Sequence, residues 1–479
     1  MCIRDRPHVA QKYRIPKIWK GDLESDIGKS ILNCDDNGPT VMMIVNMTID
    51  PAAGPVAIGR LFSGTIKDGQ TINIIDTKRE GRVQSVNFFM SNIREQVGEL
   101  GAGNIPALLG LTEARAGQTI STVKDVSLFE PSKYVSEPVV QMAIEPKHPK
   151  DLPQLVETLR KLTIEDPNLV IKIDEETGET IMAGMGVLHL DVAVNLIKDA
   201  KIDITTSEPL INYRETILGS SEVVMAKSPN RHNKIFMRVE PLEPEIAELC
   251  RDGTLSEMKD KKETTQILRD HGWEPDVAKK VMRFDSRGNV MINGTKGVQF
   301  VDESTDSLLS GFDDLINEGG LAKEQVRNCK FTFTHFVPHE DTAHRGLSQL
   351  GPASRRACLG AFLSAEPIIL EPMLAIEVRV PTDLIGNVSS VLQGKRGKVL
   401  DMQQKGAASI VIGEVPAVET FDISEKMRGQ TAGKAIWNSH FKAWTPVPKS
   451  IGATLLQEIR KRKGLSPEPP QASEFIDKE

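Results

Sequence analysis

The sequence is poor in cysteine and lacks any long apolar run, and both absences narrow its class. Its 479 residues include five cysteines (Cys2, Cys34, Cys250, Cys329 and Cys358), no two of them spaced as a CxxC pair. Neither a disulfide framework nor a zinc ribbon is indicated, so reduced thiols are the natural expectation. No apolar stretch approaches the roughly 20 residues of a membrane span, and we find no signal peptide. We therefore expect a cytoplasmic protein without membrane contact.

An excess of positive charge is also missing. The chain carries 59 lysines and arginines against 66 aspartates and glutamates, a formal net charge of −7. This balance argues against binding nucleic acid over the whole surface, so any contact with RNA must come from local basic patches. The length predicts about three domains.

A complete phosphate-binding loop is absent as well. Gly28-Lys29-Ser30 resembles the end of such a loop, but the glycine required five residues before Gly28 is replaced by Leu23. Without that backbone cradle the phosphates of a nucleotide lose their anion site. No DxxG motif followed by NKxD is positioned after it. We expect no GTP binding, no cofactor and no catalytic residue in this chain, and leave open whether it acts as an enzyme.

What the sequence does contain is a succession of distinct patterns, which predict a multidomain α+β fold. Residues 37–130 have short apolar runs separated by turn formers and glycines, as in a β-barrel. Residues 136–213 and 373–448 each follow the order β-α-β-β-α-β of a ferredoxin-like unit. Between these two units, residues 214–372 mix charged helices with glycine turns and predict an α/β domain. The middle of that segment, Glu240 to Asp285, is strongly charged and is expected to be exposed.

Helical spacing predicts which faces are buried in the first ferredoxin-like unit. Its two strands in the middle should pair across a turn at Thr177-Gly178. His189 lies on an apolar helix, where a hydrogen-bonded core histidine is expected rather than a metal ligand. The apolar stripes of its two helices comprise Leu152, Leu155, Val156, Leu159 and Leu162 on the first and Leu188, Val192, Leu196 and Ile197 on the second.

Both ends of the chain read as accessory segments. Residues 449–479 contain Arg460-Lys461-Arg462-Lys463 and then three prolines, which predict a helix running into a loose tail. Residues 1–36 read as a linker remnant, and Met1 to Arg6 as a cloning or assembly scar.

The most distinctive run is His339 to Gly346, followed by Gln349. It places imidazole, guanidinium and glycine in a segment with too little apolar content to form core, which suits contact with a polar, anionic partner. His339-Glu340 also resembles the start of a zinc-protease signature. However, the second histidine comes five residues later, about 140° around a helix at 3.6 residues per turn, so no metal site is expected. A solvent-facing loop histidine without a role is the remaining alternative.

Several motifs resemble those of elongation factor 2, the family of ribosomal translocases of archaea and eukaryotes. The resemblance begins near Pro7 and extends to the end of the chain. His339 to Gly346 is similar to the tip of domain IV in that family, and most similar to its archaeal members. Further similar motifs are Ala10–Arg14 (exit from the GTPase domain), Gly59–Thr65 (domain II), Gly184–Leu190 (domain III), Ser228–Lys234 (a second domain IV loop), Gly394–Gly397 (domain V) and Arg460–Leu465 (the C-terminus).

The resemblance implies a domain order and an activity. Residues 1–36 would follow a GTPase domain that is missing, and the intact protein would be a GTPase using GTP and Mg²⁺ to move tRNA and mRNA through the ribosome. A stand-alone ribosome- or RNA-binding module without GTPase activity is the alternative. The implied assignments are residues 37–130 to domain II, 136–213 to domain III, 214–372 to domain IV, 373–448 to domain V and 449–479 to a C-terminal helix and tail.

It also implies site residues and partners. His344 stands where the family carries diphthamide, so the diphthamide-synthesis enzymes would be partners, besides ribosomal RNA and the tRNA–mRNA pair in the decoding region. We expect a monomer. Gly346 fits either a positive-φ or close-approach position or an ordinary turn. The candidate RNA-contacting residues are Ser228, Asn230, Arg231, His232, Asn233, Lys234, His339, Asp341, His344, Arg345, Gly346, Gln349, Lys395 and Arg396.

Overall fold

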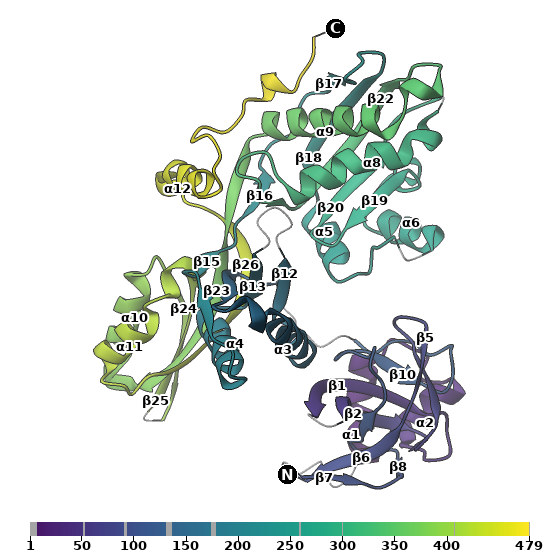
Figure 1. Ribbon diagram of the computed structural model, residues 1–479, viewed down its shortest axis with the longest axis vertical. Helices are drawn as coiled ribbons and strands as arrows, with labels where there is room; N and C mark the ends of the chain where they lie inside the picture. The colour runs from purple at the N-terminus through teal and green to yellow at the C-terminus, as the bar shows by residue number, and fades with distance from the viewer. Residues whose placement is uncertain are drawn as a thin grey trace. The chain divides into compact units, whose positions relative to one another are not determined.

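The computed structural model describes residues 7–50, 53–90, 93–130, 137–173, 179–257, 260–298, 300–406 and 408–478. These residues form two compact units, Met1–Ile211 and Asn212–Glu479 (Figure 1). The multidomain α+β class expected from the sequence is confirmed. Within the described residues, every helix is too short or too polar to cross a bilayer. Met1 to Arg6 and the expected turn at Thr177-Gly178 lie outside the described residues.

The first unit begins with two helices and an antiparallel sheet. Its elements are α1 (Pro7–Ile18), α2 (Asp26–Asn33), β1 (Val41–Asp50), β2 (Gly54–Ser63), β4 (Thr71–Ile74), β5 (Arg79–Arg82), β6 (Ser85–Met90), β7 (Ile93–Gln96), β9 (Ala107–Leu109) and β10 (Thr119–Ser121), with a separate ribbon of β3 (Thr65–Lys67) and β8 (Glu99–Gly101). The large sheet has the order β5-β4-β10-β1-β2-β9-β6-β7. Gly59 permits the close approach of β1 and β2, because a Cβ there would lie 2.1 Å from the Met43 carbonyl oxygen.

The all-β character predicted for residues 37–130 is therefore confirmed. Alternate side chains such as Met42, Ile44 and Leu61 point into one apolar core, as the two-residue period of a strand requires. Among the described residues the end strands β5 and β7 do not pair with each other, so hydrogen bonds do not close this sheet into a barrel.

The second part of this unit is the first predicted ferredoxin-like fold. Its elements are β11 (Val140–Pro146), α3 (Leu152–Glu165), β12 (Val170–Ile173), β13 (Thr180–Gly184), α4 (Val187–Asp199), β14 (Ile204–Thr206) and β15 (Leu210–Ile211). The strand order β12-β13-β11-β14 is antiparallel throughout, and β15 adds to the edge of β11. His189 is hydrogen-bonded as predicted: its Nε2 lies 2.7 Å from Asp166 Oδ2, and its Nδ1 accepts from the Met185 amide.

The predicted buried faces of the two helices need correction. In α4 the buried side chains are Leu190, Ala193, Val194 and Ile197. Leu188 is 74% exposed, and Val192 and Leu196 are exposed too. In α3, Leu155, Leu159 and Leu162 are buried as predicted, but Leu152 and Val156 are exposed. Both helices are apolar on more than one face, so spacing alone cannot identify the face that packs on the sheet.

The second unit contains a five-stranded sheet with helices on both faces (Figure 1). Its elements are β17 (Val224–Lys227), β18 (Lys234–Pro241), α5 (Pro244–Arg251), α6 (Lys261–Asp270), α7 (Pro275–Ala278), β19 (Val281–Asp285), β20 (Asn289–Asn293), α8 (Val301–Asn317), β22 (Cys329–Val337) and α9 (Leu347–Ser364). The order is β17-β18-β22-β20-β19. Met291 joins the core beneath α8 and α9, whereas Val290 and Ile292 join a second core with α5, α6 and α7.

This second core corrects the prediction for Glu240 to Asp285. The segment is charged, but its helices are amphipathic and bury Ile246, Cys250 and Leu268 against the sheet. This segment is therefore a packed part of the domain and not a solvent-exposed insertion.

A 15-residue strand, β23 (Pro367–Pro381), carries the second predicted ferredoxin-like fold. The other elements are β16 (Arg214–Ile217), β21 (Gln325–Val326), α10 (Ile385–Gln393), β24 (Lys398–Lys405), β25 (Ala408–Pro416), α11 (Ile423–Thr431), β26 (Ile436–Pro446) and α12 (Lys449–Arg462). The order β26-β23-β25-β24 repeats that of the first such unit. The start of β23, at Pro367 to Leu370, pairs instead with β16.

The segment after α12 is not the loose tail expected from its prolines. It forms a short 3-10 turn at Ala472–Glu474, and Ile476 packs against the core of the five-stranded sheet. Asp477 then bonds to β17. Proline restricts the backbone without preventing it from docking, and these contact partners lie far away in sequence.

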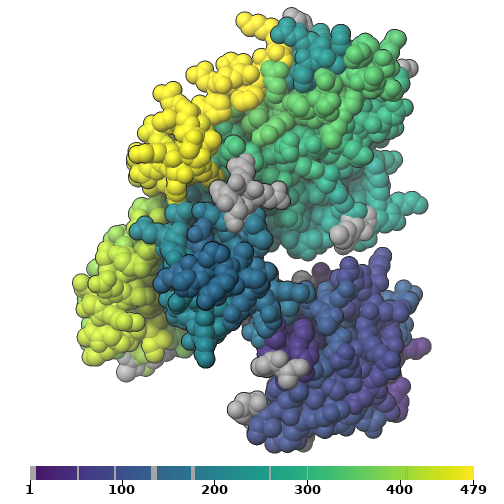
Figure 2. Space-filling view, viewed as in Figure 1, coloured from purple at the N-terminus to yellow at the C-terminus, as the bar shows by residue number. Residues whose placement is uncertain are grey.

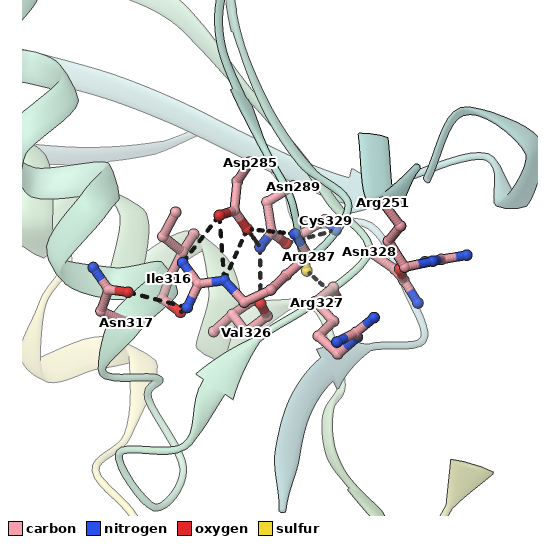
Figure 3. A network of polar contacts seen from close by, with 10 residues as sticks. All are labelled: Arg251, Asp285, Arg287, Asn289, Ile316, Asn317, Val326, Arg327, Asn328 and Cys329. Atoms are coloured by element: carbon pink, nitrogen blue, oxygen red, sulfur yellow. Dashed lines mark hydrogen bonds and ion pairs between the residues drawn. The ribbon is translucent and has the colours of Figure 1, made fainter. Parts of the chain in front are cut away.

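Polar side chains fasten the end of the five-stranded sheet at which β22 begins (Figure 3). Asp285 accepts hydrogen bonds from Arg287 and Asn289, and Arg287 also donates to the Ile316 carbonyl and to Asn317. Asn289 donates to the Val326 carbonyl and accepts from the Cys329 amide. We call this set the basal network; it comprises Arg251, Asp285, Arg287, Asn289, Ile316, Asn317, Val326, Arg327, Asn328 and Cys329.

Candidate nucleic-acid interface

The opposite end of β22 carries two loops that we call the tip: Ser228–Asn233, between β17 and β18, and His339–Gly346, between β22 and α9. The second loop contains a 3-10 turn, Thr342–His344, which Asp341 caps by accepting a hydrogen bond from the Ala343 amide at 2.9 Å. The tip thus brings together most of the candidate residues named from the sequence.

The first tip loop is held by its own hydrogen bonds. The Ser228 hydroxyl donates to Asn230 Oδ1 at 2.5 Å and accepts from the Asn233 amide at 3.0 Å. The Arg231 amide donates to the Ser228 carbonyl, and Arg231 adopts a φ of 61°. This geometry leaves the side chains of Arg231 and His232 exposed at the turn.

Amide side chains connect the two tip loops. Asn233 is 0% exposed; its Nδ2 donates to the His344 carbonyl at 2.7 Å and its Oδ1 accepts from the His339 amide at 2.9 Å. The Asn230 amide donates to Gln349 Oε1 at 3.0 Å, which ties the first loop to α9. Ser228, Asn233 and Gln349 are therefore placed to position the loops, although the sequence suggested them as direct contacts.

Three imidazoles gather at the surface of the tip. The ring centroids of His339 and His344 lie 4.7 Å apart, and that of His232 lies 5.0 Å and 5.1 Å from them. His232 is exposed and the other two are half-buried, and Asn230 is the polar neighbour of His344. The described residues contain no group of three or more histidine, cysteine or acidic side chains arranged to hold a metal ion. His339 Nδ1 accepts a hydrogen bond from the Asp341 amide at 3.1 Å, and His344 Nδ1 lies 3.5 Å from Asn230 Nδ2.

Arg345 does not extend from the tip as the sequence suggested. It is 7% exposed, its guanidinium lies 3.7 Å from the ring centroid of Phe300, and Nη2 lies 3.6 Å from Glu303 Oε2. Arg345 packs the second loop onto the start of α8 through a cation–π contact. Its neighbour Gly346 has a φ of −64°, and a Cβ added there would meet no atom within 4 Å, so it is an ordinary turn glycine.

Lys395 and Arg396 lie outside the tip, and both are engaged within the chain. Arg396 makes a two-pronged contact with Glu371, each N–O distance being 2.9 Å, and its Nε donates to Glu419. Lys395 is 9% exposed and lies 2.5 Å from Asp422 Oδ1. The hydrogen bonds that Arg396 donates to Glu371 raise the pKa of Arg396, although burial opposes this shift. Both cations are therefore paired with carboxylates of this chain.

The remaining outward-facing groups form a mixed surface. Arg231 and the half-buried Lys234 supply positive charge beside the imidazoles, whereas Asp341 and Glu340 supply negative charge on the second loop. The tip surface therefore carries charges of both signs.

A nucleotide does not fit the segment that resembled a phosphate loop. Gly28, Lys29 and Ser30 lie inside α2, whose first turn is capped by Ser25 accepting from the Gly28 amide. A phosphate cradle needs free amides before the helix begins. Here a Cβ at Gly28 would lie 2.3 Å from the Asp22 carbonyl oxygen, so the glycine serves close packing.

Comparison with known proteins gives matches to four family models. The matching models are Elongation factor Tu domain 2 (residues 54–121), Elongation Factor G, domain III (135–208), Elongation factor G, domain IV (253–366) and Elongation factor G C-terminus (368–455). The domain IV match includes β22, the second tip loop and α9.

Individual relatives agree with the family models. Elongation factor 2 of Cenarchaeum symbiosum is 72% identical over 99% of this chain. The elongation factors 2 of Sulfurisphaera tokodaii and Metallosphaera sedula are 47% and 46% identical over 98% of it. The chain spans about 65% of the length of these relatives (65%, 65% and 64%). With this identity, and with the four domain models matched in order along the sequence, the chain belongs to the elongation factor 2 family.

Proposed function

We propose that this chain is the part of a ribosomal translocase that contacts RNA and that its tip enters the decoding region of the small subunit. One observation carries the proposal: three imidazoles and Arg231 gather on two loops that buried amides hold in place. Ribosomal RNA, together with the tRNA and mRNA in the decoding region, is the proposed partner.

The chemistry of the tip suits an A-form minor groove. That groove is wide and shallow and displays 2′-hydroxyls and base edges. Imidazole nitrogens can hydrogen-bond to hydroxyls, and their rings can stack on an exposed base. Contacts of this kind do not depend on the base sequence. A factor that acts on every codon requires such independence. Asn233 and Gln349 contribute by fixing the loops before contact, so less conformational entropy is lost on binding.

The movement itself would be driven elsewhere in the full-length protein. GTP and Mg²⁺ would be bound by a GTPase domain, because the residues around Gly28 do not form a nucleotide site. The ferredoxin-like folds at 136–213 and 373–448 would relay the nucleotide state to the tip. In this mechanism the chain selects between two conformational states and makes no covalent bond.

We further propose that His344 is converted to diphthamide in the native host. A quaternary ammonium would add a permanent positive charge beside His232 and His339 without requiring a protonated imidazole. The half-buried ring of His344 is accessible to the modifying enzymes. Intact mass measurement of natively purified protein should show the added mass, and mass equal to the plain sequence would contradict this assignment. We also propose that the protein is cytoplasmic in its host and monomeric, so the same preparation should have the mass of a monomer in solution.

The function is tested by replacing His344 with alanine in the full-length factor. We expect translocation to slow about tenfold, since stacking on one base contributes about 1–3 kcal/mol. His271→Ala, an exposed histidine on the loop after α6, is the matched control and should change nothing. Normal translocation by the His344 variant would contradict the tip assignment. If the chain binds small subunits but supports no translocation when joined to a GTPase domain, a stand-alone RNA-binding module is the better description.

A further inference from the structure

The segment Phe475–Lys478 docks against the end of β17, where the first tip loop begins, although the two lie about 250 residues apart in sequence. Figure 1 shows the yellow end of the chain reaching the level of β17, and Figure 2 shows it lying against the teal and green surface of the same unit. β17 is the edge strand of the five-stranded sheet. The docked segment therefore covers backbone groups that an edge strand would otherwise leave open.

Asp477 makes the central contacts of this segment. Its amide donates to the Met225 carbonyl at 2.9 Å, and its Oδ2 accepts from the Lys227 amide at 2.7 Å. The same carboxylate lies 3.1 Å from Arg356 Nη1 on α9. Lys227 Nζ donates in turn to the Lys478 carbonyl at 2.8 Å. Burial opposes the charged form, but the Lys227 amide and the Arg356 guanidinium hold the pKa of Asp477 below its ordinary value.

These contacts join the two elements that lead into the tip. Lys227 ends β17, and the next residue, Ser228, opens the first tip loop. Arg356 lies nine residues after Leu347, the first residue of α9, or about 14 Å along the helix axis. α9 starts directly after the second tip loop. Asp477 is thus the only described side chain bonded to both Lys227 and Arg356.

The polar contacts continue from Lys227 to His344. Ser228 bonds to Asn230 and Asn233, and Asn233 donates to the His344 carbonyl. A displacement of Lys227 therefore changes the anchor of the loop that supports the imidazole cluster. From this arrangement we propose that Asp477 is a positioning residue, which holds β17 and α9 together and thereby sets the placement of His232, His339 and His344. The proposal deepens the RNA-contacting function assigned to the tip and rests on it.

A glycine on α9 provides an independent way to release the segment. A Cβ at Gly360 would lie 2.9 Å from Ile476 Cγ1, so Gly360→Ala should push Ile476 off the helix without altering any charge. Alanine is also the better helix former, which keeps α9 itself intact. Asp477→Ala removes the carboxylate contacts to both the Lys227 amide and Arg356, whereas Arg356→Ala removes only the ion pair between Asp477 and α9. Glu468→Ala, at an exposed position between α12 and this segment, is the matched control.

Two readouts on the chain itself test the proposal. Hydrogen exchange follows the Arg231 and Asn233 amides, and NMR of histidine-labelled protein follows the rings, of which the sequence has nine. We expect Asp477→Ala and Gly360→Ala to speed tip exchange about tenfold and to shift the signals of the three tip histidines. Arg356→Ala should have a smaller effect, and Glu468→Ala none.

Unchanged exchange and unchanged histidine signals in Asp477→Ala would overturn the proposal. If residues 471–478 nevertheless exchange faster in that variant, the segment only covers the strand edge. If they do not, another group holds it in place. Neither readout needs a ribosome. Failure here is therefore distinguishable from failure of the proposed function, which the His344→Ala translocation assay decides separately.

Discussion

The two ends of β22 are built from the same kinds of polar side chain but use them differently. At Cys329, the Asp285 and Arg287 side chains of the basal network pair with each other while only 12% and 16% exposed, and Asn289 is fully buried. At Val337, roughly 26 Å away for eight steps along a strand, the tip buries Asn233 and leaves His232 and Arg231 outside. At the base, the polar side chains stabilise the fold. At the tip, some of them stay exposed and, in the proposed function, contact a partner.

At the tip, exposed side chains are supported by buried ones. Two of the three imidazoles at the tip depend on one buried neighbour, because Asn233 holds the backbones of His344 and His339. In the basal network, Arg287 and Asn289 both donate to Asp285 and to backbone carbonyls, so its central side chains are engaged inside the chain. Substitutions at the base should therefore lower the stability of the fold. Substitutions of the buried tip residue Asn233 should displace the tip loops, and substitutions at the tip surface should affect function alone.

The largest effect is expected at the base. Arg287→Ala leaves Asn289 as the remaining side-chain donor to the Asp285 carboxylate and leaves the Ile316 carbonyl without the Arg287 hydrogen bond. Removing one member of a buried ion pair typically costs about 3–5 kcal/mol. The Arg287 and Asp285 side chains are 16% and 12% exposed, so we expect a loss at the lower end of that range and a clear fall in the urea midpoint of the second unit. Arg269→Ala, an exposed arginine on α6, is the control and should stay within about 0.5 kcal/mol. Equal midpoints for the two variants would remove the contrast.

A second effect at this end should depend on pH. Burial raises the pKa of Glu215 to about 7, although the amides of Leu321, Ala322 and Glu324 oppose the shift. Above the unfolded value of 4.5 the native state holds a proton that the unfolded state has lost, so stability is full at low pH and declines as pH rises through about 7. The decline amounts to about 3 kcal/mol.

Glu215→Gln should abolish this decline. Unfolding free energies measured across the range should give a flatter curve than the unsubstituted chain gives. Glu222→Gln, at an exposed position, should leave the slope as it was. A Glu215→Gln curve parallel to the original would mean that the three backbone amides keep the carboxylate charged.

An intermediate effect is expected from the tip scaffold. Asn233→Ala removes the bonds to the His344 carbonyl and the His339 amide and should cost about 1–3 kcal/mol. Hydrogen exchange should locate the loosening in residues 228–234 and 339–346. Asn438→Ala on an exposed position of β26 serves as control. Loosening spread over the whole five-stranded sheet would show that the tip is not a separate scaffold.

The smallest change in stability is expected at the tip surface. His344→Ala removes a half-buried ring with polar neighbours, so the unfolding free energy should change by no more than about 0.5 kcal/mol. Calorimetry of the two proteins would measure it. A loss of several kcal/mol would mean that the imidazole belongs to the core and would also weaken the translocation test.

The sequence predicted those features that depend on local pattern. Strand alternation and turn residues gave both ferredoxin-like orders, and the bonded state of His189 followed from its apolar helix. The buried face of α4 could not be predicted, because Leu188, Val192 and Leu196 are spaced four residues apart, just as the buried pairs Leu190–Val194 and Ala193–Ile197 are.

For the candidate site, residue type indicated which positions are polar but not which way they turn. Arg396 lies 25 residues from Glu371, with which it makes a two-pronged contact. The motif Gly394–Gly397 contains no residue that would indicate this pair. Arg345 meets Phe300 only after α8 and α9 have packed. Asp477 was missed entirely, since its partner Lys227 lies 250 residues earlier and no local pattern marks either one.

The uninterrupted course of β23 has a mechanical consequence. Its first residues pair with β16 and the rest with β25 and β26, all within 15 residues of extended chain. Because β16, β23, β25 and β26 belong to one hydrogen-bonded sheet, a force applied at β16 is passed to β25 and β26 with little slack. Any swing of the histidine-bearing arm must therefore take its pivot from some other segment of the molecule.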